Sequence, residues 1–247
     1  MQTLKKTGEN PGLIPGFFGP NVSCENQGWR GVNFRFQDRA QAGRLLADKL
    51  GAYAGRADVV VLGLPRGGIP VAFEVARRLQ APLAAFLVRK LGVPGHEELA
   101  MGAIASGGVC FLNAPVIEAL DIPQRAIDEA VARERRELER REQVCRVAPM
   151  PELRDRVVIL IDDGLATGAS MRAAVIAVRE HHPARVIVAA PVAAKETYHE
   201  FKREADEVVC VETPAGFQGV GQWYEDFSQT TDEEVRELLS QISNLKF

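Results

Sequence analysis

Two adjacent carboxylates, Asp162 and Asp163, directly follow a run of apolar residues at 157–161. Such a run, mostly β-branched, is typical of a strand buried on both faces of a parallel sheet. A loop of small and hydroxyl residues comes next, and residues 171–179 then have the apolar pattern of a helix. The free amides of such a turn lie at the positive end of the helix dipole, so the pattern predicts a phosphate site. Because carboxylates repel phosphate, the two acids need another target, either sugar hydroxyls or a divalent cation.

A second junction of the same kind occurs earlier in the chain. Apolar residues 59–62 lead through a glycine-rich loop at 65–68 into a helix expected from about 71 to 79. Arg66 in this loop adds a permanent charge whose forked donors match phosphate oxygens, although a plain structural turn is the alternative for this loop taken alone. Both loops follow strands of the predicted parallel sheet, so we expect them at the same edge of the sheet. Neither loop has the spacing of a P-loop or of a dinucleotide-binding fingerprint.

The two loops together resemble those of the type I phosphoribosyltransferases. The family signature is an apolar strand, two acids, three variable residues and Thr-Gly-x-Thr/Ser, which residues 162–170 match with Ser in the last hydroxyl position. The resemblance implies that the chain binds 5-phosphoribosyl pyrophosphate (PRPP) with Mg²⁺, and it also predicts a cis peptide between Pro65 and Arg66. It assigns the ribose hydroxyls and the metal (mostly through ligand and water) to Asp162 and Asp163, the 5′-phosphate to Ala166, Thr167, Gly168, Ala169 and Ser170, and pyrophosphate to Pro65, Arg66, Gly67 and Gly68.

A charged stretch at residues 89–98 follows a strand expected at 83–88. It contains two cations, two glycines and a proline, which predicts a mobile loop. In the family a flexible loop at this place closes over the reacting centre, which implies that Arg89 and Lys90 are catalytic residues that neutralise the leaving pyrophosphate. Solvated charges at the end of a strand are an equally weighted alternative. Residues 99–105 and 109–112 are predicted to form a hairpin.

A segment near the carboxyl end, residues 212–227, concentrates aromatic residues in a chain that has only 6% of them. The order loosely resembles the base-binding segment of purine phosphoribosyltransferases, which implies that Phe217, Trp223 and Tyr224 stack on a planar base. Packing at the end of the core is the slightly favoured alternative. Enzymes of this family that act on 6-oxopurines usually carry an acid where this chain has Ala166, so the resemblance does not name the base.

Alternating strands and helices predict an α/β fold of three layers, a mostly parallel sheet with helices on both faces. The resemblance adds a small hood built from N- and C-terminal segments. We expect residues 1–35 to form a tail or arm, residues 36–230 the main domain, and residues 231–247 a C-terminal helix packed on it. A helical insertion is expected at about 113–147, where the long charged helix 123–146 has only a thin apolar stripe and is interpreted as a solvated arm rather than a substrate or subunit contact.

Composition narrows the class of protein further. The chain has 247 residues, 46% of them hydrophobic, and a net charge of −3, so no basic field attracts it to nucleic acid or to an anionic membrane. No apolar run approaches the roughly 20 residues needed to span a bilayer. Four scattered cysteines favour reduced thiols in a cytoplasmic protein, without a disulfide or zinc site. A homodimer is expected from the family alone.

The reaction implied by the resemblance is transfer of the phosphoribosyl group from Mg-PRPP to a nitrogenous base, with a purine-like base favoured, and release of pyrophosphate in nucleotide metabolism. Two alternatives remain open. One is a regulatory protein that binds PRPP without turnover, and the other is a transferase or hydrolase that uses PRPP with an acceptor other than a base.

Overall fold

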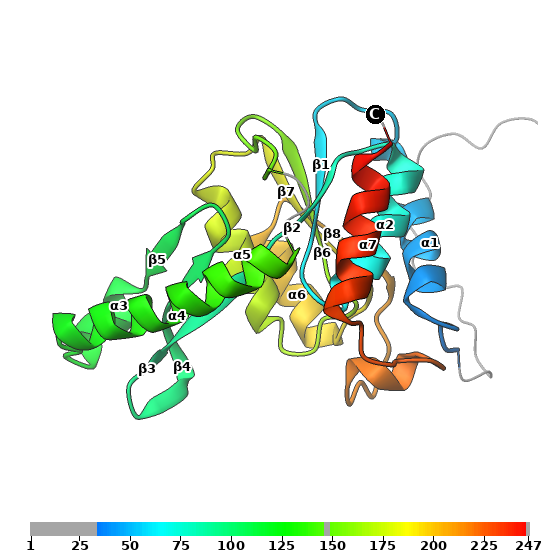
Figure 1. Cartoon of the computed structure of the whole chain (residues 1–247). Coiled ribbons are helices and arrows are strands. Elements are labelled where there is room, and N and C mark those ends of the chain that lie inside the picture. Colours follow the sequence, from blue (N-terminus) through cyan, green and yellow to red (C-terminus); the bar gives the residue numbers. More distant parts are fainter. Residues whose placement is uncertain (1–33, 146–148, 246–247) are drawn as a thin grey trace, which may run out of the picture. The chain divides into compact units, whose positions relative to one another are not determined.

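The computed structural model describes residues 34–145 and 149–245. A parallel sheet with the strand order β2-β1-β6-β7-β8 forms its centre (Figure 1). The residues of β1 and β6 are buried throughout, which explains why both strands are continuous apolar runs in the sequence. The strands are β1 (Val59–Gly63), β2 (Leu83–Ala85), β6 (Val157–Ile161), β7 (Arg185–Val192) and β8 (Glu207–Glu212).

Helices cover both faces of this sheet. Successive residues of β1 alternate between two core clusters: Val59 and Val61 pack with α1 and α2, whereas Val60 and Leu62 pack in a cluster with residues of α5. Figure 1 shows α1, α2 and α7 on one side of the sheet and α5 and α6 on the other. The predicted three-layer α/β class is therefore confirmed. The helices are α1 (Arg39–Lys49), α2 (Gly68–Leu79), α5 (Ala169–Arg179), α6 (Lys195–Glu204) and α7 (Asp232–Ser243), with a 3₁₀ turn η1 (Gly51–Tyr53) after α1.

A second, antiparallel sheet consists of β3 (Val88–Val93), β4 (His96–Ala105) and β5 (Cys110–Leu112). The pairing of β4 with β5 confirms the predicted hairpin. The expectation of an irregular loop at 89–98 is wrong, because β3 and β4 pair there as a second hairpin; the mobility of this hairpin stays a prediction. Burial of Leu91 and Val93 stabilises β3 as a strand. The glycines and the proline lie at the shift in register and at the turn of the hairpin.

The predicted insertion contains α3 (Ala114–Ala119) and the 22-residue helix α4 (Gln124–Cys145). The interpretation of α4 as a solvated arm is wrong for its inner face. Ile127 and Leu138 are buried in a cluster that also contains Leu91 of β3, Met101 of β4 and Leu239 of α7. The thin apolar stripe is therefore enough to pack α4 against the antiparallel sheet and α7. One charged residue of α4, Glu134, is also largely buried and pairs with Arg89 of β3.

The amino- and carboxyl-terminal segments meet in the predicted small hood. Phe36 N donates to Trp223 O at 2.8 Å, and Glu225 N donates to Phe36 O at 2.8 Å, beside the 3₁₀ turn η2 (Val220–Trp223). The expected tail lies outside the described residues, except for residues 34 and 35, and so does Cys24. Cys110, Cys145 and Cys210 are free thiols. Within the described ranges, no helix has the length and apolar character needed to cross a membrane.

Candidate active site

The two predicted anion loops meet at the carboxyl ends of β1 and β6. These strands are neighbours, and Gly63 pairs with Ile161, so both loops leave the sheet at the same level. A Cβ atom at Gly67 would lie 2.0 Å from Asp163 Oδ2, and one at Gly68 would lie 2.7 Å from Ile161 O. Only glycine permits such a close approach of the two loops. The peptide bond between Pro65 and Arg66 is cis, as predicted.

The acid pair lies at the centre of this junction. Asp162 Oδ1 accepts a hydrogen bond from Asp163 N at 2.9 Å. Burial raises the pKa of both carboxyls, and the charge of Asp163 raises the pKa of Asp162 further, well above its usual range. Two adjacent, buried carboxylates of this kind favour a bound cation or hydroxyl donors nearby. Among the described residues, no group of three or more His, Cys, Asp or Glu side chains is arranged to hold a metal ion.

Arg39, the first residue of α1, is the partner that sequence reasoning missed. Its Nε donates to Asp163 Oδ2 at 2.8 Å, and only 12% and 14% of the two side chains are exposed. Its Nη1 donates to Ser228 O at 2.7 Å, and its guanidinium lies 4.1 Å from the ring centroid of Phe227. A cation in the first turn of a helix opposes the helix dipole. An arginine at this unfavourable helix position is the feature of the sequence that could have indicated a carboxylate partner for Arg39.

Tyr224 supports the acid pair from the hood. Its hydroxyl donates to Asp163 O at 2.6 Å, and 3% of the residue is exposed. Burial raises the pKa of the Tyr224 phenol. Phe217 and Trp223 are half-buried and pack against the same hood cluster around Phe36. The structure thus places the three aromatic residues predicted to bind a base in or against the hood core, with Tyr224 turned to the backbone of Asp163.

The loop at 166–170 presents open donors at the start of α5. Gly168 adopts a left-handed conformation with φ 70°, and a Cβ atom there would meet Phe201 at 2.6 Å. The Thr197 hydroxyl holds the loop by donating to Ala166 O at 2.5 Å. Within the described part of the chain, the amides of residues 166–171 and the hydroxyls of Thr167 and Ser170 make no hydrogen bond. Unpaired donors at the start of a helix are suited to binding an oxyanion.

The two cations expected to neutralise pyrophosphate lie in β3, apart from the acid pair. Arg89 donates through Nε and Nη2 to Glu134 of α4 at 2.9 and 2.6 Å. Although burial opposes it, the hydrogen bonds from Arg89 and Arg133 hold the pKa of Glu134 below its usual range. Lys90 lines a cavity of about 420 Å³ that Thr167 also lines, between the antiparallel sheet and α5. Arg89 thus ties β3 to α4, and Lys90 shares a cavity with Thr167 of the predicted phosphate-binding loop.

Comparisons with known proteins agree with this geometry. The family model of the phosphoribosyl transferase domain matches residues 36–225. Two Mycobacterium tuberculosis proteins, "Putative phosphoribosyl transferase MT0597" of strain CDC 1551 / Oshkosh and "Putative phosphoribosyl transferase Rv0571c" of strain H37Rv, are each 48% identical over 201 residues. Those residues are 81% of this chain and 45% of each relative, so the chain spans less than half of their length.

A solved structure, that of the protein TT1426 from Thermus thermophilus, is 44% identical to the chain. The match covers 84% of this chain and 99% of that one, with a TM-score of 0.76. The architecture described above is therefore shared with an independently solved protein. Because the family model spans the sheet, both anion loops and the hood contact at Tyr224, the chain belongs to the phosphoribosyl transferase domain family.

Proposed function

We propose that the chain transfers the phosphoribosyl group of Mg-PRPP to a nitrogenous base, with a purine-like base favoured, and releases pyrophosphate. The observation that carries the proposal is the contact of the two loops, in which a Cβ atom at Gly67 would overlap Asp163 Oδ2. This contact brings an anion loop, an acid pair and a second anion loop together at one sheet edge. 5-Phosphoribosyl pyrophosphate has a pyrophosphate at one end, a 5′-phosphate at the other and ribose hydroxyls between them. This order matches that of the first loop, the second loop and the acid pair between them.

Each part of the site has a role in this proposal. The amides and hydroxyls of residues 166–170 bind the 5′-phosphate, Asp162 and Asp163 orient the ribose hydroxyls, and the loop at 65–68 binds pyrophosphate. The transition state of such a transfer resembles an oxocarbenium ion, so the protein acts mainly by positioning the donor and stabilising the leaving group.

The acid pair also fits Mg²⁺, which is usually bound by one or two carboxylates together with ligand oxygens and water. Asp162 and Asp163 are the residues that would hold it. Burial raises the pKa of both carboxyls, so a cation beside them would stabilise their charged forms. When bound, the cation supplies charge stabilisation for the leaving pyrophosphate.

The packing of the hood favours a second candidate function, in which the chain uses PRPP with an acceptor other than a base or binds PRPP without any acceptor. Tyr224 is buried and bonded to Asp163 O, so the aromatic segment supports the core rather than offering a free stacking face. On this alternative the chain either uses PRPP with another acceptor or binds it as a regulator.

Incubation with Mg-PRPP and a pooled set of bases separates these functions. Pyrophosphate and new nucleotide are measured with and without the pool. Release of pyrophosphate that requires a base supports the transferase, base-independent release supports another acceptor, and binding without turnover supports a regulator. Absence of both binding and turnover would contradict all three.

A further inference from the structure

A pocket of about 330 Å³ lies on the side of the pyrophosphate loop that faces α4 and α7. Pro65 and Arg66 form one wall, Arg140 and Arg141 of α4 a second, and Asp232 at the start of α7 a third. We call it the arginine pocket. Its volume is within the range of about 300–1,000 Å³ that is common for small-ligand sites. None of the residues assigned above to the ribose or to the 5′-phosphate lines it.

The arginine pocket has more cationic than anionic side chains. Arg66 Nη1 is 3.8 Å from Asp232 Oδ1, beyond hydrogen-bond distance. Arg140 donates through Nε and Nη2, and Arg141 through Nε, to the single carboxylate of Glu137. Their combined hydrogen bonds lower the pKa of Glu137 to about 2. One carboxylate shared by two guanidiniums leaves their remaining N–H groups available, and forked donors of this kind match phosphate oxygens.

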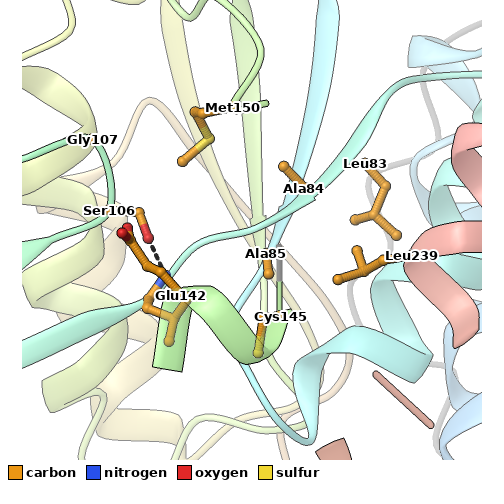
Figure 2. A pocket seen from close by; sticks show the side chains of 10 residues that line it. Leu83, Ala84, Ala85, Ser106, Gly107, Glu142, Cys145, Met150 and Leu239 are labelled. Atoms are coloured by element: carbon orange, nitrogen blue, oxygen red, sulfur yellow. Dashed lines mark hydrogen bonds between the residues drawn. The ribbon is translucent and has the colours of Figure 1, made fainter. Parts of the chain in front are cut away.

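The cavity next to the arginine pocket has a different chemistry. This smaller space has a volume of about 100 Å³ and shares Leu87 and Cys145 with the arginine pocket. Figure 2 shows it from close by. Aliphatic side chains such as Leu239 dominate its wall. Among the described residues that line this smaller space, none is a cation, in contrast to the three arginines of the arginine pocket.

The packing of α4 explains how its arginines reach the pyrophosphate loop. The buried stripe that includes Leu138 fixes the helix against β3, β4 and α7. Arg140 and Arg141 follow Leu138 within one turn, and α7 begins at Asp232 beside them. The inserted helix is thus packed where its cations extend the surface that begins at Arg66.

We propose that the arginine pocket binds a pyrophosphate group, and that Arg140 and Arg141 of the inserted helix bind this leaving group directly. The inference rests on the proposed function, since it extends the pyrophosphate loop of that site. On this proposal, α4 contributes two guanidiniums to the binding of PRPP in addition to the two anion loops.

Calorimetric titration of the full chain with two probes tests the inference. Inorganic pyrophosphate with Mg²⁺ reports on the arginine pocket, and ribose 5-phosphate reports on the loop at 166–170. The test variant is the double substitution Arg140→Gln and Arg141→Gln. The matched control is Arg125→Gln, which breaks a comparable surface pair with Glu129 elsewhere on α4. Circular dichroism checks that each variant retains its helix content.

The double variant is expected to bind pyrophosphate about tenfold more weakly or worse, with ribose 5-phosphate unaffected and the control unchanged. Unchanged pyrophosphate affinity overturns the inference, as does an equal loss for both probes, which indicates general damage. Failure of the wild-type chain to bind pyrophosphate also overturns it. Arginine-dependent pyrophosphate binding without any binding of ribose 5-phosphate or PRPP supports the pocket and contradicts the proposed transferase.

Discussion

Arg39 ties the hood to the acid pair, and its removal is expected to have a large effect on stability. The substitution Arg39→Ala removes a charge-assisted hydrogen bond to Asp163, a bond to Ser228 O and a cation–π contact with Phe227. Charge-assisted bonds contribute about 1.5–3 kcal/mol and cation–π contacts about 0.5–1 kcal/mol or more. We therefore expect the free energy of unfolding to fall by about 2–4 kcal/mol, since the Asp163 carboxylate also loses its partner.

Urea unfolding of four proteins isolates the pair: the wild type, Arg39→Ala, Asp163→Asn and the double variant. The coupling free energy is expected to be about 1.5–3 kcal/mol, because both side chains are largely buried. Arg35→Ala, at an exposed position just before α1, is the control and is expected to change stability by less than about 0.5 kcal/mol. A coupling below about 0.5 kcal/mol would refute the assignment of Arg39 as the main partner of Asp163.

Three further predictions follow from other contacts. Asp162→Asn is expected to be more stable than the wild type at pH 8, and the difference in their free energies of unfolding is expected to shrink as the pH falls toward 4. Burial and the charge of Asp163 raise the pKa of Asp162, so the wild type loses stability as the pH rises through that pKa. A pH-independent gap in urea unfolding would contradict this. Gly67→Ala, whose Cβ would lie 2.0 Å from Asp163 Oδ2, is expected to cost about 1–3 kcal/mol and to weaken PRPP binding, whereas Gly219→Ala, with open space around it, is not. Burial raises the pKa of Tyr53 to about 12, so the free energy of unfolding is expected to fall by about 2 kcal/mol between pH 10 and 12, where Tyr53 ionises mainly in the unfolded chain. Tyr53→Phe has no such ionisation. An equal dependence of unfolding free energy on pH in the two proteins would disprove this.

The central sheet and its two loops were predictable because their signals are local. β1 and β6 are short buried strands, and each is followed at once by a loop with the residues predicted to bind phosphate. Parallel strands place such loops at one edge of the sheet, so their proximity follows from chain order. The cis peptide between Pro65 and Arg66 followed only from the family resemblance, since no residue type at that bond demands it.

The rest depends on contacts between distant parts of the chain. Arg39 and Asp163 are separated by 124 positions, and the contact of Tyr224 with Asp163 spans 61. The hairpin of β3 and β4 was hidden because Gly92, Pro94 and Gly95 are typical loop residues, while the burial of Leu91 decides the structure.

The position of α4 was hidden for a related reason. Its charged residues outnumber the few apolar ones, so the sequence pattern favours a solvated helix. The packing surface on β3, β4 and α7 that receives Ile127 and Leu138 exists only in the folded chain. The arginine pocket therefore has no signature in the sequence around Arg140 and Arg141.

Calorimetric titration of Mg-PRPP into the wild type and into the double variant Asp162→Asn and Asp163→Asn tests the central claim most directly. The claim predicts saturable, Mg²⁺-dependent binding to the wild type. It also predicts loss of that binding in a variant that remains folded by circular dichroism. Equal affinity in the two proteins would contradict the assignment of the acid pair to the phosphoribosyl donor.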